Sequence, residues 1–471
     1  MNEEENAIVN VLAERYASKA MQRIWSREEK IRQERRLWVE VMKSQSRLGI
    51  NISKEQIACY EQSINDVNLR SIDRRERVLK HDLKARIEEF NSLAGLQLIH
   101  LALTSRDVTE NVELVQTRDA LALIRAQVLG ILNLLAIKME RHKSLVMVGR
   151  THNVPAQLTT LGKRFATFAE ELLFALERLD SLIDRLPLRG IKGPVGTSQD
   201  LFDLLDSDGE KIELDFARSV GFSRILDSTG QTYPRSIDFE ILSTLAQLSA
   251  APSNLALMVR LMSGAGLLSE GFSEGQVGSS AMPHKVNPRS SERISGLTTV
   301  LKGYLFMVSE TSGDLWNDGD VSCSVVRRVA LPDAFFALDG IFQTTASVLQ
   351  NVEVFEEHIA LEVNKYLPYV TTTKILASAI RAGMDRETAY RKIQDAALAS
   401  LQGREKVEEI GFFKRLADDP DFLLNASDME REASSLHSLP VAERQVSKVL
   451  TKIDEITRAA QTLDFKFEEV I

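Results

Sequence analysis

Residues 278–288 carry the densest set of side chains in this chain that could do chemistry. The segment reads Gly-Ser-Ser-Ala-Met-Pro-His-Lys-Val-Asn-Pro, so hydroxyls, an imidazole, an ammonium and a carboxamide lie between glycines and prolines. Proline removes a backbone donor and fixes φ, which excludes a helix interior. A flexible connector would share these breakers, but the density of donors favours a mobile loop that closes over a site. In such a loop Ser279, Lys285 and Asn287 come together, and the last two suit a carboxylate or an enolate-like charge.

A histidine stands in a second polar segment, residues 149–155, which read Gly-Arg-Thr-His-Asn-Val-Pro. Pro155 suits the first turn of a helix that follows it. His152 would then lie where free backbone N–H groups and the positive end of the helix dipole collect anions. An imidazole held there could donate or accept a proton. The alternative is a histidine that only caps the helix.

Residues 104–107, Thr-Ser-Arg-Asp, precede another helical pattern. Thr104 with Asp107 has the spacing of a capping box, in which the two side chains satisfy free N–H groups at a helix start. A plain cap is the simpler interpretation. The functional alternative is that the hydroxyls of Thr104 and Ser105, with nearby amides, hold a carboxylate.

Two further clusters are less specific. Lys80, His81 and Asp82 are consecutive, and such a group ordinarily lies on a solvated face. His81 could also assist a proton transfer.

Near the start of a later helical pattern, Ser324, Arg327 and Arg328 could bind a phosphate, although ordinary surface charge explains them equally well. We find no histidine, cysteine and carboxylate spacing typical of a metal site, and no glycine-rich turn that follows a strand.

These clusters must be positioned by long helices. Apolar residues recur at steps of three and four in four segments, and apolar side chains on most faces indicate a buried bundle. Pro252 is expected to kink one of these helices, and residues 190–196 form the clearest non-helical excursion. The predicted long helices cover 112–142, 157–186, 235–270 and 331–350.

The helical patterns divide the chain into three predicted domains. A region of shorter helices covers residues 1–110, the long-helix bundle covers 111–364, and a second region of shorter helices covers 365–471, with helices near 371–383, 386–402 and 441–462. So many fully apolar helix faces predict oligomerisation. A monomer with a thick core is the alternative.

The composition limits the class of protein. The chain has 471 residues, 44% hydrophobic and 27% charged, with a net charge of −9, which argues against non-specific nucleic-acid binding. Two cysteines without a pairing pattern fit a reducing cytosol. We see no apolar run of about 18 residues and no signal-peptide pattern, so a cytoplasmic protein without a membrane span is expected.

At residues 278–288 the chain resembles the fumarase/aspartase superfamily, whose signature is a GSSxMPxKxNP loop. Within that superfamily it is similar to the adenylosuccinate lyases over nearly its whole length, whereas fumarases and argininosuccinate lyases carry Gly or Gln at the position of His284. The supporting residues are Arg15-Tyr16 with Trp25, Lys80-His81-Asp82, Thr104-Ser105, Thr151-His152 with Pro155, Gln231, and Ser291-Glu292-Arg293.

The resemblance implies an all-α fold of three helical domains, in which five long central helices per subunit form the twenty-helix core of a homotetramer. It implies active sites built from three subunits, no cofactor and no metal. The implied reaction is the β-elimination of fumarate from adenylosuccinate, giving AMP, and from succinyl-aminoimidazole carboxamide ribotide, in purine biosynthesis.

The resemblance also implies roles for individual residues. Ser279 is the expected general base and His152 the expected general acid, with His81 assisting and Lys285 stabilising the developing charge. The succinyl carboxylates are expected to contact Thr104, Ser105, Gln231, Lys285 and Asn287. The nucleotide end is expected to contact Arg15, Tyr16, Arg293, Ser324 and Arg328. Lys80, His81 and Asp82 are also expected to bind the substrate.

Two alternatives remain at the level of sequence. Carboxymuconate cycloisomerases share the loop, so the motif does not separate them, although the Arg15-Tyr16 opening favours a nucleotide substrate. An inactive helical scaffold would be expected to lack Ser279, His152 or Lys285, and all three are present.

Overall fold

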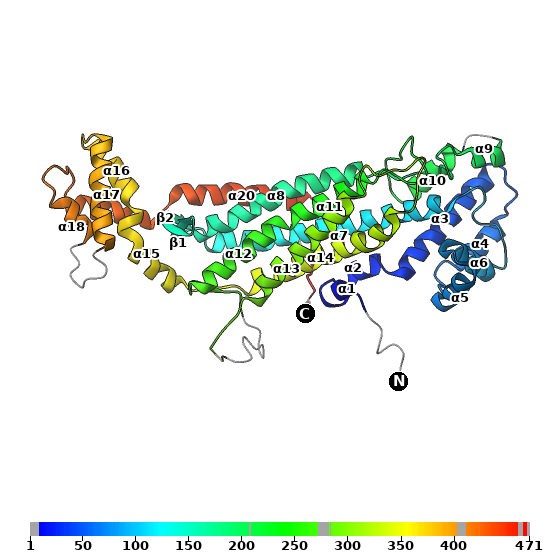
Figure 1. Cartoon of the computed structure of the whole chain (residues 1–471), viewed down its shortest axis with the longest axis horizontal. Helices are drawn as coiled ribbons and strands as arrows, with labels where there is room; N and C mark the ends of the chain where they lie inside the picture. The colour runs from blue at the N-terminus through cyan, green and yellow to red at the C-terminus, as the bar shows by residue number, and fades with distance from the viewer. Residues whose placement is uncertain are drawn as a thin grey trace.

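The computed structural model describes residues 9–206, 209–271, 282, 284–402, 411–459 and 465–468. The chain is long and narrow, with a central bundle of helices and a group of shorter helices at each end (Figure 1). Among the described residues the β-structure consists of two small antiparallel pairs, β1 with β2 and β3 with β4, so the expected all-α class is confirmed. The strands are β1 (Val146–Thr151), β2 (Val154–Thr160), β3 (Leu268–Ser269) and β4 (Glu353–Val354).

The bundle is formed by helices that run along the long axis of the molecule (Figure 1). Contacts between α7 and α8, between α13 and α14, and between α14 and α7 hold it together. Its helices are α7 (Ser105–Arg141), α8 (Leu161–Arg185), α11 (Ser236–Leu248), α12 (Ala250–Gly264), α13 (Arg289–Ser309), α14 (Cys323–Asn351) and α20 (Pro440–Ala459).

Shorter helices occupy the two ends and the connections (Figure 1). The N-terminal ones are α1 (Val11–Arg15), α2 (Lys19–Ile24), α3 (Arg27–Arg47), α4 (Lys54–Gln62), α5 (Leu69–Leu79) and α6 (Asp82–Ala94), and α9 (Gln199–Leu205) and α10 (Glu210–Ser219) follow α8. The opposite end holds α15 (Glu356–Val370), α16 (Thr372–Arg381), α17 (Arg386–Gln402), α18 (Phe412–Ala417), α19 (Ala426–Ser434) and the short 3₁₀ helix η3 (Ser435–His437).

Pro252 breaks the predicted helix over 235–270 into two. The proline ring clashes with the carbonyl four residues earlier, which belongs to Leu248. α11 ends at that residue, Ser249 lies between the helices, and α12 begins at Ala250. Ser249 keeps helical dihedral angles (φ −76, ψ −11), so the proline divides the predicted helix at one residue.

Three local predictions differ from the structure. α7 and α14 begin at Ser105 and Cys323, upstream of the predicted starts at 112 and 331, because the polar residues at the start of α7 and the two arginines near the start of α14 interrupt the apolar repeat. α13 was not among the four predicted long helices, since glycines and hydroxyl residues weaken its repeat. Pro155 lies in β2 and not in a helix, and α8 begins only at Leu161.

The apolar core is shared unevenly among the three predicted regions. One continuous cluster joins the N-terminal helices to the bundle and includes Trp38, Leu121 and Phe335. A separate cluster around Ile375 and Met429 fills the C-terminal group. α20 belongs to the first cluster and packs on α8 and α7, although its sequence falls in the predicted domain 365–471.

Candidate functional site

The start of α7 is fixed by one buried carboxylate, that of Asp107. Its Oδ2 accepts from the backbone N of Thr104 at 2.7 Å, which is one half of the predicted capping box. Its Oδ1 accepts from Arg189 Nη1 at 2.6 Å and from the backbone N of Lys192 and Gly193 at 2.9 and 3.0 Å. The carboxylate thus ties the turn that carries Thr104 and Ser105 to the loop after α8.

Arg189 extends this connection to Gln231. Its Nη2 donates to the carbonyl oxygens of Gly193 and Gly230, both at 2.9 Å. The backbone N of Gln231 then donates to the carbonyl of Asp318 at 2.6 Å. Residues 230 and 318 approach so closely that a Cβ on Gly230 would lie 2.1 Å from the Asp318 oxygen, which explains why glycine stands there. Thr104, Ser105 and Gln231 are therefore parts of one connected region.

A second predicted group gathers at the start of α6. His81 is the N-cap residue, and its Nδ1 accepts from the backbone N of Lys84 at 3.3 Å. Arg328 Nη2 lies 3.3 Å from Asp82 Oδ2, so two segments 246 residues apart meet here. Burial opposes ionisation of Asp82, but Arg86 and Arg328 outweigh it and lower its pKa.

Lys80 and Ser324 complete this group in the sequence prediction. Lys80 ends α5 in the left-handed region at φ 54, and this turns the chain toward His81. Ser324 lies in the first turn of α14, one turn before Arg328. The group is largely exposed, as a substrate-binding surface requires.

Arg327 is not a phosphate ligand in this structure. Its Nε donates to Asp238 at 2.8 Å and its Nη1 lies 2.8 Å from Glu113, while Tyr233 contacts its Nη2. Arg235 and Glu110 belong to the same buried cluster, with an Nη2–Oε1 distance of 2.8 Å. The sequence interpretation of Arg327 as a possible phosphate contact is thus corrected, because its side chain points into the bundle and holds α14 against α7 and α11.

A third group lies nearer the middle of the bundle. The guanidinium carbon of Arg293 stands 5.8 Å from the centroid of the Tyr16 ring. Burial, opposed in part by Tyr16, lowers the pKa of Arg293, and Arg15 is close enough to contribute in the same direction as burial. Arg15, Tyr16 and Arg293 are therefore close together in the structure.

His152 lies at the tip of the hairpin between β1 and β2. His152 and Asn153 have φ of 51 and 62, left-handed values that a two-residue hairpin turn requires. The predicted placement at a helix N-terminus is wrong, so the dipole argument for an anion at His152 does not hold. Its imidazole is exposed on the surface of the chain.

His152 lies far from the group around Thr104 within one chain. Thr104 precedes α7 and the hairpin follows it, and the 37 residues of this helix span about 55 Å at 1.5 Å per residue. In Figure 1 the hairpin and the helices α3 to α6 lie toward opposite ends of the molecule. A single chain therefore does not bring His152 to the group around Thr104.

The signature loop lies partly outside the described residues, and Ser279 is among those not described. Glu270, eight residues before the loop, is joined to the start of α13: its carboxylate accepts from the backbone N of Ser290 and Ser291 at 2.9 and 3.0 Å and from Ser291 Oγ at 2.9 Å. Glu270 is buried, so this connection is shielded from water. Lys285 is exposed and Asn287 is half-buried just before α13.

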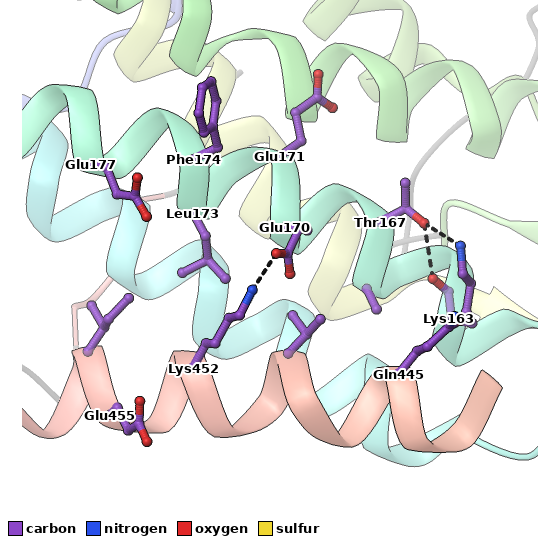
Figure 2. Close-up of a pocket in the computed structure, with 13 residues that line it drawn as sticks. Lys163, Thr167, Glu170, Glu171, Leu173, Phe174, Glu177, Gln445, Lys452 and Glu455 are labelled. Carbon is purple, nitrogen blue, oxygen red and sulfur yellow. Dashed lines mark hydrogen bonds and ion pairs between the residues drawn. The ribbon is translucent and has the colours of Figure 1, made fainter. Parts of the chain in front are cut away.

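The larger surface grooves do not coincide with the predicted residues. A groove of about 870 Å³ lies between α8 and α20, where Glu170 and Lys452 form an ion pair (Figure 2). Another of about 990 Å³ runs between α8 and α12 beside the hairpin. No group of three metal-ligating side chains is found in the part of the chain that the structure describes.

Sequence reasoning does not identify the buried charged residues that connect the segments carrying the predicted site residues. From its sequence Asp107 is interpreted only as part of a cap, and no sequence pattern singles out Arg189, Glu110 or Glu270. One signal was present: charged residues inside otherwise apolar helices must find partners when buried. The identity of those partners depends on segments about 80 to 220 residues apart in sequence.

α7 is also the one described helix that is long and apolar enough to pass for a membrane span. This carries little weight, because 56% of the relevant window is buried inside the bundle.

Comparison with known proteins identifies the family. Residues 7–303 match the lyase family. The adenylosuccinate lyase of Saccharomyces cerevisiae is 30% identical over 436 residues, which cover 88% of this chain and 90% of that protein. The adenylosuccinate lyase of Schistosoma mansoni is 33% identical over 393 residues, 82% of each chain.

A solved structure shares the fold at low identity. The 3-carboxy-cis,cis-muconate lactonizing enzyme from Pseudomonas putida superposes with a TM-score of 0.82 at 17% identity, over 95% of this chain and all of that one. The family match and the near-full-length relatives, taken with the signature loop and this fold, show that the chain belongs to the adenylosuccinate lyase family of the fumarase/aspartase superfamily.

Proposed function

We propose that this protein cleaves adenylosuccinate to AMP and fumarate, and the related succinyl-aminoimidazole carboxamide ribotide, in cytoplasmic purine biosynthesis. The observation that carries the proposal is the near-full-length relation to adenylosuccinate lyases of several organisms. The presence of Ser279, Lys285 and His152 supports a working enzyme.

The chemistry sets requirements that these residues can meet. A proton must leave the carbon next to a carboxylate, which places negative charge on that carboxylate. Ser279 is the proposed base, and Lys285 with Asn287 would stabilise the charge as it forms. The departing amine needs a proton, for which His152 is the proposed acid.

The remaining predicted residues divide between the two ends of the substrate. Thr104, Ser105 and Gln231, connected through Asp107 and Arg189, are proposed to hold the succinyl carboxylates. Arg15, Tyr16 and Arg293 form one proposed nucleotide-binding group, and Ser324 and Arg328 form another beside Lys80, His81 and Asp82.

We infer that the active unit is a homotetramer whose sites combine residues from different subunits. The separation of about 55 Å along α7 supports this, because His152 must come from another copy to reach the Thr104 group. Large apolar side chains exposed on bundle helices also support it, among them Phe174 (67% exposed), Leu261 (54%) and Phe306 (66%).

The test is turnover by the purified protein. Conversion of adenylosuccinate should change the ultraviolet absorbance as the purine loses its succinyl group, and AMP and fumarate should appear in equal amounts. Light scattering on the same sample gives the assembly. A homogeneous tetramer that leaves adenylosuccinate unchanged would overturn the proposal.

A further inference from the structure

The described C-terminal tail, residues 465–468, crosses the bundle near the Arg15–Tyr16 turn. Its Phe467 packs on α7 at Gly130: a Cβ at this glycine would lie 2.8 Å from Phe467 Cε2 and 2.9 Å from Cζ. Glycine inside a helix costs about 1 kcal/mol relative to alanine. Because Gly130 has no side chain, it leaves space on the surface of α7, and the Phe467 ring fills that space.

The next residue, Glu468, connects the tail to two other helices. Its backbone N donates to Gln343 Oε1 on α14 at 2.7 Å. Its Oε2 accepts from the backbone N of Lys19, the first residue of α2, at 2.9 Å. The tail therefore bridges α14 and the start of α2.

Asp339 holds the same turn from the side of α14. This fully buried carboxylate accepts from Ser18 Oγ at 3.2 Å and also from the backbone N of Ser18 and from Gln127. Gln343 Nε2 lies 3.4 Å from Asp339 Oδ1, so the glutamine joins Asp339 to Glu468. Hydrogen bonds therefore hold Ser18 and Lys19 from two sides. Asp339 binds Ser18, Glu468 binds Lys19, and Gln343 connects Asp339 to Glu468, which closes a ring.

The turn formed by residues 15–19 carries Arg15 and Tyr16, which are proposed to contact the nucleotide. Tyr16 abuts α14 so closely that a Cβ on Gly340 would lie 2.8 Å from Tyr16 Cβ and 3.0 Å from its carbonyl oxygen. The Tyr16 ring in turn faces Arg293. Two residues after this contact, the chain enters the ring formed by Ser18, Lys19 and Glu468.

We propose that Phe467 and Glu468 are positioning residues for substrate binding: they hold the Arg15–Lys19 turn against α14, so that Arg15 and Tyr16 present a fixed surface to the nucleotide. The inference rests on the proposed function. It predicts that displacing the tail weakens binding and leaves the chemical step nearly unchanged, because neither tail residue contacts the reacting atoms.

The experiment uses three full-length variants that displace the tail in different ways. Gly130→Ala fills the space that the Phe467 ring occupies, and Phe467→Ala removes the ring. Glu468→Gln weakens the hydrogen bond from the backbone N of Lys19. Each should raise KM for adenylosuccinate about tenfold, because each lets the Arg15–Lys19 turn move away from α14 and so weakens nucleotide binding by about 1.4 kcal/mol. kcat should stay within about twofold. Hydrogen exchange measured by mass spectrometry should accelerate in residues 10–24 and not along the rest of the bundle.

Two variants serve as matched controls. Gly303→Ala makes the same substitution inside α13, where an added Cβ meets nothing within 4 Å. Lys466→Ala alters the exposed residue beside Phe467. Both should keep the wild-type KM and exchange, with the assembly state checked for every variant.

The outcomes separate the inference from the proposed function. A wild-type protein that does not turn over adenylosuccinate overturns the function. If hydrogen exchange in residues 10–24 is unchanged in all three tail variants, the tail does not hold the Arg15–Lys19 turn, whatever the activity, and the inference is overturned. Faster exchange throughout the bundle, or a fall in kcat with KM unchanged, also overturns it, since the tail would then stabilise the fold in general.

Discussion

Asp107 and Arg189 form an ion pair in which both side chains are completely buried, with 2.6 Å between Oδ1 and Nη1. The pair joins the first turn of α7 to the loop that follows α8. Through the other bonds of the two side chains it also fixes Thr104 and the carbonyl of Gly230, next to Gln231. Two segments proposed to hold substrate carboxylates thus depend on one interaction.

Asp107→Asn should destabilise the protein strongly. The substitution leaves the guanidinium of Arg189 buried without its counter-charge, which typically costs about 3–5 kcal/mol. Urea denaturation followed by circular dichroism measures the loss. The matched control is Asp180→Asn, which removes a partly exposed partner of Arg125 and should cost less than about 1 kcal/mol. Equal effects of the two substitutions would contradict this account of the Asp107 pair.

The neighbours Arg327 and Arg328 should behave in opposite ways. Arg327→Ala removes a buried cation from Glu113 and Asp238 and should lower stability by about 3–5 kcal/mol. Arg328→Ala removes an exposed side chain and should change stability by less than about 1 kcal/mol.

The same two variants differ in kinetics. Arg328→Ala should raise KM for adenylosuccinate, since its side chain is a proposed nucleotide contact. Steady-state kinetics beside thermal denaturation separates the two effects. A stable Arg327→Ala protein, or an Arg328→Ala enzyme with normal KM, would refute the corresponding assignment.

His100 should make the protein less stable in mild acid. Burial lowers its pKa from 6.5 to about 4, and its Nδ1 accepts from Trp38 Nε1 at 3.2 Å, so the native imidazole stays neutral. Between these two pKa values the unfolded chain binds more protons than the native one. Stability is therefore lost as pH falls from about 6.5 to 4, by at most about 3 kcal/mol.

His100→Asn tests this directly. The amide oxygen can accept from Trp38, and asparagine tolerates the φ of 65 at this position. Urea midpoints measured from pH 7 to pH 4.5 should fall less steeply in the variant. His142 contributes a slope of the same sign, because burial lowers its pKa as well, so the dependence is reduced and not abolished. An unchanged slope would rule out a titrating role for His100.

Ser279→Ala and His152→Ala should each reduce kcat by about 10²-fold or more, the usual contribution of a positioned acid or base. Neither substitution should alter the assembly, because His152 is exposed and both changes are small. Stopped assays with both purine substrates measure kcat, and light scattering measures the assembly. A near-normal rate in either variant would remove that residue from the mechanism.

Mixing the two inactive variants should restore part of the activity. If Ser279 and His152 of one site come from different subunits, mixed tetramers contain some sites with both residues intact. The samples are mixed, briefly dissociated in mild denaturant, reassembled and assayed, with each variant treated alone as the control. Mixed tetramers that stay inactive would show that each site takes both residues from one subunit.

Several features of the fold follow from local sequence. The apolar repeats predict α8 and the C-terminal helices α16, α17 and α20 closely, since a helix buried along its length must repeat its apolar residues every three or four positions. Pro252 marks an interruption for a steric reason that involves only Leu248. The hairpin that carries His152 was missed because its turn uses His152 and Asn153 in the left-handed region, without the glycine that usually marks such turns.

By itself, the sequence determined the all-α class, the long bundle helices and the groups of residues that carry chemistry, because these depend on side-chain type and short-range spacing. Only the tertiary structure decided that Arg327 is buried while Arg328 is exposed, that Asp107 meets Arg189, and that His152 lies a helix length away from Thr104. Burial, ion pairing and distance between sites all depend on which segments pack together, and segments hundreds of residues apart leave no local pattern from which that packing can be deduced.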